Sequence, residues 1–262
     1  MSRYLCLLFI LTFSHSLKAE LIAFDLTDSG SQNRLSYQNQ FTGGFSSSQD
    51  AFHVVKSNDL LFAPEQFLDR SHQAADSLGL VDVTESNFTH SFVVSDTVNS
   101  DHNLGFLSAI WTFDISGYQN IELSMAVAAM GDFETSDKFS FSYAFDNNAH
   151  SQIWSSSVDT ASSFEYQMAD GKMVRLNDPL KINGKVVSDQ FSLLNKSIAG
   201  FGDSLSLIFS AKADGGSEVF AFNNLKVYGE AKPAQPVPEP QGIFFIALTA
   251  LIFTQLCREY WF

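Results

Sequence analysis

The chain has almost no cysteine. Cys6 and Cys257 are the two in 262 residues, and each lies in a terminal segment that differs in composition from the body. A disulfide framework of the kind that staples small secreted domains is therefore excluded for the body. Its fold must be stabilised by a hydrophobic core, which about 210 residues can supply because folding at that size buries about 70% of the unfolded surface.

Histidine and basic residues are also scarce. The six histidines show no metal-ligand spacing such as HExxH, so the sequence offers nothing for zinc chemistry. Asp and Glu number 29 against 15 Lys and Arg, which gives a formal net charge of −14 at pH 7. Such a surface repels nucleic acid and anionic lipid, so we expect no nucleic-acid partner. Good solubility, or binding of a divalent cation, is the natural consequence.

The N-terminal segment has the composition of a secretory signal peptide. Arg3 is followed by an apolar run from Tyr4 to Phe13 and then by small and polar residues that end at Ala19. This order predicts a signal peptide over residues 1–19, with cleavage after Ala19. The alternative is an uncleaved anchor, for which the apolar run is short.

Proline is rare except near the C-terminus, where four of the chain's six prolines lie between Lys232 and Pro240. Residues 231–241 therefore form a stiff, extended linker. The hydrophobic tail over residues 242–262 includes an apolar run from Gly242 to Leu256, whose helical length of about 22 Å is short for a hydrocarbon core of about 30 Å. We expect this tail to form a hydrophobic helix that lodges in a membrane.

The motif Val237-Pro238-Glu239-Pro240, the hydrophobic run behind it and the basic residue Arg258 resemble the PEP-CTERM sorting signal of Gram-negative bacteria. In that family an exosortase, a membrane protease-transpeptidase, recognises such a tail. The resemblance implies export through the inner membrane and a place in the cell envelope or extracellular matrix. Family tails end in an arginine cluster, whereas Arg258 stands alone here. The alternative is a plain C-terminal anchor with a proline-rich linker.

The body, residues 20–230, alternates apolar and polar residues at period two. In KFSFSYAF, for example, Phe139, Phe141, Tyr143 and Phe145 share one face. Turns rich in Gly, Asn, Asp and Ser separate such runs. The pattern predicts an all-β fold, an antiparallel β-sandwich of jelly-roll type, with at most one short helix. The predicted helix covers Glu65 to Leu78, and the clearest predicted strands cover 108–115, 120–130, 138–145, 204–211 and 219–228.

Acidic residues crowd two segments between predicted strands. Because Ca²⁺ takes six to eight oxygen ligands, such loops are candidates for a structural calcium site. The candidate ligands are Asp132, Glu134, Asp137, Asp214 and Glu218. A solvated acidic rim is the alternative, and the same carboxylates are also candidates for a glycosidase acid and base, although sequence spacing does not fix their separation.

Aromatic residues are plentiful, and most must fill the core of a sandwich. Trp154 lies in mostly polar company and is the best candidate for a platform on which a sugar ring stacks, followed by Tyr166 and Tyr118. Trp111 shares a strand face with Phe113, so we expect it to be buried.

The block Gly202-Asp203-Ser204-Leu205 resembles the nucleophile motif of GDSL esterases. In that family a histidine base follows the serine, whereas the last histidine here is His150. We interpret the block as a turn before a strand.

The segment DGGSEVFAFNNLKVYG loosely resembles the closing strand of jelly-roll modules of exported bacterial proteins, including carbohydrate-binding ones. Together these features favour an exported, non-catalytic sandwich that associates with the envelope or with an extracellular polysaccharide. The alternatives are an extracellular polysaccharide hydrolase and a purely structural adhesion module.

Overall fold

The fold is described by a computed structural model. It describes residues 18–41, 44–45, 47, 49–56, 59, 63–71, 79–82, 90–100, 102–103, 105–146 and 148–233. The chain divides into two compact units, Met1–Ala231 and Lys232–Phe262, and only two residues of the second are described. The sorting motif, Arg258, the hydrophobic tail and most of the predicted signal peptide therefore lie outside the described residues. No helix among the residues described is long and apolar enough to cross a membrane.

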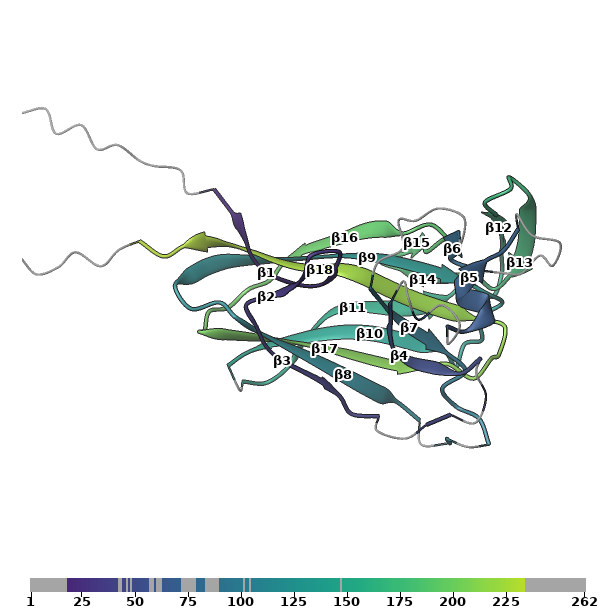
Figure 1. Cartoon of the computed structure of the whole chain (residues 1–262), viewed down its shortest axis with the longest axis horizontal. Coiled ribbons are helices and arrows are strands. Elements are labelled where there is room, and N and C mark those ends of the chain that lie inside the picture. Colours follow the sequence, from purple (N-terminus) through teal and green to yellow (C-terminus); the bar gives the residue numbers. More distant parts are fainter. Residues whose placement is uncertain are drawn as a thin grey trace, which may run out of the picture. The chain divides into compact units, whose positions relative to one another are not determined.

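The first unit is an all-β sandwich of two antiparallel sheets, as the alternation predicted (Figure 1). Strand β18 organises the first sheet, because it pairs with β9 on one side and with β1 and β7 on the other. The strands of this sheet are β16 (Ser192–Ser197), β9 (Tyr118–Met130), β18 (Val219–Ala231), β1 (Glu20–Thr27), β2 (Gly30–Gln32), β7 (Ser91–Ser95) and β4 (Ala51–Val55).

The second sheet has β10, β17 and β8 at its centre and lies face to face with the first. Its strands, in order, are β15 (Lys185–Val186), β14 (Leu180–Ile182), β11 (Ser151–Val158), β10 (Lys138–Phe145), β17 (Ser204–Lys212), β8 (Leu107–Asp114) and β3 (Arg34–Asn39). Two small additions are the hairpin of β12 (Ser163–Gln167) with β13 (Met173–Asn177) and the parallel pair of β5 (Leu68–Asp69) with β6 (Val81–Asp82). All five strands predicted from the alternation are present as β8, β9, β10, β17 and β18.

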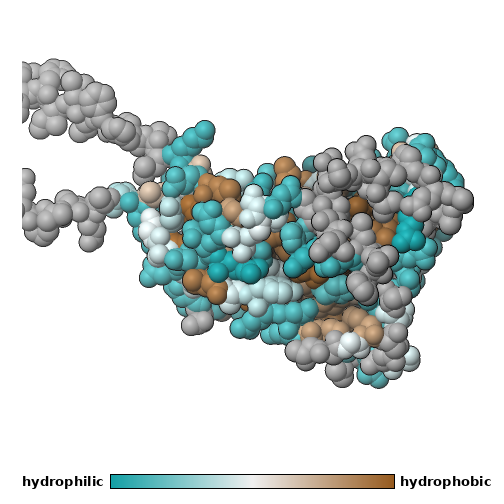
Figure 2. All heavy atoms as spheres, in the orientation of Figure 1, coloured by the Kyte–Doolittle hydropathy of each residue, from teal (hydrophilic) through white to brown (hydrophobic). Residues whose placement is uncertain are grey.

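An aromatic cluster joins the two sheets. Phe209 of β17 packs against Phe222 of β18, with ring centroids 4.9 Å apart, and against Phe141 of β10 at 4.8 Å. Trp111 is fully buried in the same cluster, as predicted. The outer surface is different: on the face in Figure 2 most of the described residues are hydrophilic, and the hydrophobic ones form separate patches.

A second, smaller core covers the outer face of the first sheet. Val219 and Ala221 of β18 point into it, whereas Phe220 and Phe222 point into the main core, as the alternation of a strand requires. The β12–β13 hairpin contributes Tyr166 to this smaller core. The start of β18 is therefore buried on both faces.

The helix predicted over Glu65 to Leu78 is wrong in its first part. Glu65–Phe67 forms a single 3₁₀ turn after Pro64, and the chain then extends into β5. The physical reason is strand pairing, because Leu68 and Asp69 pair with Val81 and Asp82, and the backbone N–H of Leu80 donates to the carbonyl of Phe67 at 3.0 Å, which leaves that carbonyl bonded outside any helix. Residues 72–78 lie outside the described residues.

We predict that Phe209→Ala lowers the free energy of unfolding by about 3–5 kcal/mol, because it leaves a cavity where the two sheets meet. Phe201 is 83% exposed, so the matched control Phe201→Ala changes it by no more than about 0.5 kcal/mol. Urea unfolding monitored by circular dichroism measures both values. Equal losses in the two variants would show that the aromatic cluster does not hold the sheets together.

Candidate metal centre

Two loops that cross between the sheets meet at one end of the sandwich. The loop 131–137 leads from β9 in the first sheet to β10 in the second, and the loop 213–218 leads from β17 in the second sheet back to β18 in the first. Strand register places the loops together, because Met130 pairs with Val219 and Lys138 pairs with Lys212. Four of the five predicted calcium ligands lie where these loops meet.

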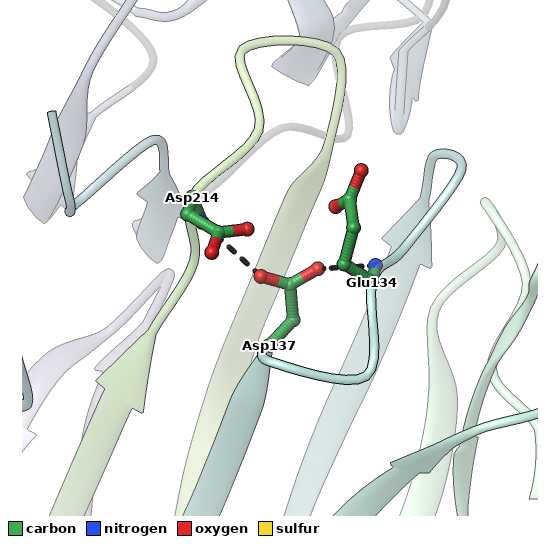
Figure 3. A group of neighbouring side chains, drawn as sticks. All are labelled: Glu134, Asp137 and Asp214. Carbon is green, nitrogen blue, oxygen red and sulfur yellow. Dashed lines mark hydrogen bonds between the residues drawn. The ribbon is translucent and has the colours of Figure 1, made fainter.

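Asp137 ties the two loops to each other. Its Oδ2 accepts a hydrogen bond from the backbone N–H of Glu134 at 2.7 Å, and its Oδ1 accepts one from the backbone N–H of Asp214 at 3.1 Å (Figure 3). The side chain is fully buried. Burial is the largest influence on this carboxyl and raises its pKa above the ordinary value, although the two amides oppose the change.

Three carboxylates converge at this point. Glu134, Asp137 and Asp214 each place a carboxylate oxygen within 4.8 Å of the others. The side chains of Glu134 and Asp214 are exposed, whereas that of Asp137 closes the bottom of the group. Such a set of oxygen ligands around a small space suits a hard cation, and calcium accepts this mixture of carboxylates, backbone carbonyls and water.

Glu218 is a fourth carboxylate, buried beside the other three. It is 1% exposed, and among the described residues no amide, ammonium or guanidinium group donates a hydrogen bond to its side-chain oxygens, whose polar neighbours are the carboxyl groups of Glu134 and Asp137. Burial and the neighbouring carboxylates of Glu134 and Asp137 raise its pKa well above the ordinary value for Glu. A buried carboxylate without a donor or a cation is costly, so this residue points to a ligand that the protein itself does not supply.

Two glycines make room for Glu218. A Cβ atom at Gly131 would come within 2.7 Å of its Cγ, and a Cβ at Gly215 would overlap its carboxylate. The pair therefore fixes the path of this side chain between the two loops.

Asp132, the fifth predicted ligand, is not part of the group. Its side chain is exposed. The pKa of its carboxyl is raised, first by partial loss of solvent and then by the negative charges of Asp178 and Glu134. It lies at the margin of the group, next to the loop after β13.

The predicted sugar platforms Trp154 and Tyr166 are both wrong. Trp154 is 2% exposed and pairs across the strands with Phe141, so its ring points into the main core. Tyr166 is fully buried in the smaller core beside Phe164. The polar residues next to Trp154 lie on the exposed face of β11. Trp154 itself lies on the inner face of this strand, so its polar neighbours did not indicate that it is exposed. Tyr118 is half-buried at the start of β9, near Glu20.

Ser204 is the first residue of β17 and directly follows a turn, as interpreted from its sequence. Its hydroxyl donates to Asp146 Oδ1 at 3.2 Å, and the backbone N–H groups of Asp203 and Ser204 donate to the same oxygen. The serine therefore opens β17 in a carboxylate-capped turn.

A separate cleft, which no sequence motif indicated, lies where the end of β1 meets the start of β7, two strands that both pair with β18. It encloses about 320 Å³. The residues around it are Asp25, Leu26, Gly30, Ser31, Arg34, Tyr37, Val54, Lys56 and His90.

Comparison with known proteins gives resemblance in fold only. No family model matches the chain, and no curated protein matches it in sequence. Among solved structures, TmCBM61 in complex with β-1,4-galactotriose has a TM-score of 0.34 and 8% identity, over 74% of this chain and 88% of that one. The Clostridium thermocellum Xyn10B CBM22-1–GH10 modules complexed with xylohexaose give a TM-score of 0.33 and 9% identity, over 83% of this chain and 30% of that one. A family 30 carbohydrate-binding module gives a TM-score of 0.31 and 15% identity, over 80% and 95%. At these TM-scores the resemblance carries no functional inference.

We predict that the stability of the chelator-treated protein falls as the pH rises from about 5 to about 8. Glu218 and Asp137 have raised pKa values in the folded state, so their contribution is full below the unfolded pKa of about 4 and is lost as they ionise. Glu218→Gln, which stays neutral, should flatten this fall and be more stable than the wild type at about pH 8. Thermal midpoints in EDTA measure the effect, and a wild-type midpoint that rises with pH would contradict it.

Proposed function

We propose that this chain is an exported, non-catalytic β-sandwich, that calcium completes its fold at the junction of the 131–137 and 213–218 loops, and that it serves in the cell envelope or extracellular matrix. The observation that carries the metal centre is Glu218, which is buried among described residues that offer it no cationic partner and lies beside the carboxyl groups of Glu134 and Asp137. A divalent cation would offset the repulsion that these groups exert on one another.

Calcium fits this site better than softer metals. Every side-chain ligand is a carboxylate oxygen, whereas zinc prefers nitrogen and sulfur. Glu134 and Asp214 are exposed, so water can complete the coordination and the ion can exchange. Extracellular calcium modules work at dissociation constants of about 10⁻⁴–10⁻³ M, which an exported protein would meet.

The limits of the sandwich support export and sorting. Strand β1 begins at Glu20, directly after the predicted cleavage site at Ala19, and β18 ends at Ala231, the first residue of the predicted proline-rich linker. Cleavage after Ala19 or within the Pro-Glu-Pro motif would therefore leave every described strand intact. In this proposal an exosortase-type protease acts on the tail, and the sandwich is the part that remains.

The hydrolase alternative is less well supported. A glycosidase needs two carboxyl groups facing a sugar in a cleft. Among the described residues that surround the cleft, Asp25 is the one carboxylate, and its Oδ2 is ion-paired with Arg34 at 2.7 Å.

The cues for the adhesion alternative include two edge strands, β16, where Leu193 is exposed, and β3, where Leu35 is exposed. Lys196 on β16 is the kind of charge that discourages pairing between edges.

We predict that Ca²⁺ raises the thermal midpoint of the chelator-treated full chain. At a free concentration of about 100 times the dissociation constant, the added stability is about 2.7 kcal/mol. Glu218→Gln and Asp137→Asn should lose most of this gain, whereas Glu165→Gln, an exposed glutamate on β12, should keep it. Differential scanning fluorimetry with Mg²⁺ as the competing ion tests this. A wild type that does not respond, or a Glu218→Gln variant that responds fully, would refute the metal centre.

A second prediction concerns processing in the native host. The wild-type protein should lose residues 1–19 and the hydrophobic tail, because both lie beyond the strands. A variant carrying Pro238→Ala, Glu239→Ala and Pro240→Ala should keep the tail. Intact mass spectrometry distinguishes the two, and retention of residues 242–262 in both proteins would leave a plain membrane anchor instead of a sorting signal.

A further inference from the structure

The cleft lies where β7 gives way to β1 along one side of β18, a strand that is itself irregular at this level. The register between β18 and β9 shifts between Asn223 and Lys226, and Asn224 has a φ of 50°, a left-handed conformation that asparagine tolerates well. Before this point β18 pairs with β7, and after it β18 pairs with β1. Because β7 and β1 follow one another along the same side of β18, a space is left where one ends and the other begins.

Side chains from several segments surround this space. Asp25 lies on β1, Arg34 and Tyr37 lie on β3 of the facing sheet, and Lys56 and His90 flank the outer strands β4 and β7. The cleft therefore opens at the joint edge of the two sheets. Its volume of about 320 Å³ lies at the lower end of the range for small-ligand sites, enough for one or two sugar rings.

The charge of the cleft is opposite to that of the chain. Acidic residues outnumber basic ones 29 to 15 overall. Here Arg34 and Lys56 face a single carboxylate, Asp25, which is buried and already paired with Arg34. The ion pair holds the guanidinium in place, and within the described part of the chain the Lys56 ammonium has no ion-pair partner, so both groups can contact an anionic group.

Tyr37 gives the cleft an aromatic wall in a fixed position. Its ring packs against Trp111 with centroids 5.0 Å apart, and the Arg34 guanidinium lies 6.0 Å from its centroid. Burial, followed by the charge of Asp25, raises the pKa of Tyr37 to about 12, so the phenol stays neutral and can donate a hydrogen bond.

We propose that this cleft binds a uronic acid residue of an acidic polysaccharide, with the carboxylate held by Lys56 and Arg34 and the sugar ring placed against Tyr37. An inorganic anion would use the cationic groups but not the ring, and a neutral sugar would use the ring but not the cations. The inference extends the matrix association of the proposed function and does not depend on the metal centre.

The test is calorimetric titration of the full chain with trigalacturonate, with galactotriose as the neutral match and inorganic phosphate as the bare anion. EDTA is present, because uronates and the acidic loops both take up calcium. We expect trigalacturonate to bind, and galactotriose and phosphate each to bind at least about tenfold more weakly, since each lacks one of the two recognised groups. Equal binding of galactotriose would overturn the charged contact, and equal binding of phosphate would overturn the sugar contact.

Variants locate the site. Lys56→Gln should weaken trigalacturonate binding about tenfold, the loss expected for one charge-assisted contact. Lys185→Gln, an exposed lysine on β15, is the matched control and should bind as the wild type does. Arg34→Gln should also weaken binding, but because it leaves Asp25 unpaired, its thermal midpoint is measured alongside. If Lys56→Gln binds trigalacturonate as tightly as the wild type does, the assignment of the binding site to this cleft is wrong.

The proposal of a metal centre and the proposal of a uronate-binding cleft can be tested independently of each other. Glu218→Gln should still bind trigalacturonate in EDTA, and Lys56→Gln should still gain stability from calcium. Loss of trigalacturonate binding in Glu218→Gln, with its fold intact, would overturn the assignment of the ligand to the cleft.

Discussion

Phe209 of β17 and Phe222 of β18 face each other across the sandwich, and their contact holds together the two sheets that these strands organise. Once the sheets are fixed, the two crossing loops, 131–137 and 213–218, must lie against each other where β18 begins. Asp137 and Glu218 stand directly before β10 and β18, so aromatic packing forces their carboxylates into one small volume. The electrostatic strain of the candidate metal centre is thus imposed by the hydrophobic core.

The same core explains how one acidic chain carries two sites of opposite character. Strand β18 keeps a single partner, β9, along one side, but exchanges β7 for β1 along the other. Its first residue adjoins the carboxylates, and the cleft lies beside the point where β7 gives way to β1.

The sequence predicted what depends on local periodicity. Alternation in KFSFSYAF places Phe139 and Phe141 in the core, and the acidic loops hold the group that includes Glu134. The sequence did not predict that Trp154 is buried. Its polar neighbours lie on the exposed face of β11, whereas the tryptophan lies on the opposite, inner face. Nor did the sequence predict the cleft, whose residues come from separate strands that only the register of β18 brings together.

The pairing of Glu20 with Gly229 makes the first and last strands of the sandwich neighbours. β1 therefore has no partner on β18 until nearly the whole body of the chain has been made, and folding must wait for contacts between residues far apart in sequence. Such topologies fold slowly, because the entropy of closing a long loop is lost before the pairing is gained. A chain that lacks its last strand therefore cannot complete the first sheet, so the sandwich closes only once β18 is available to β1.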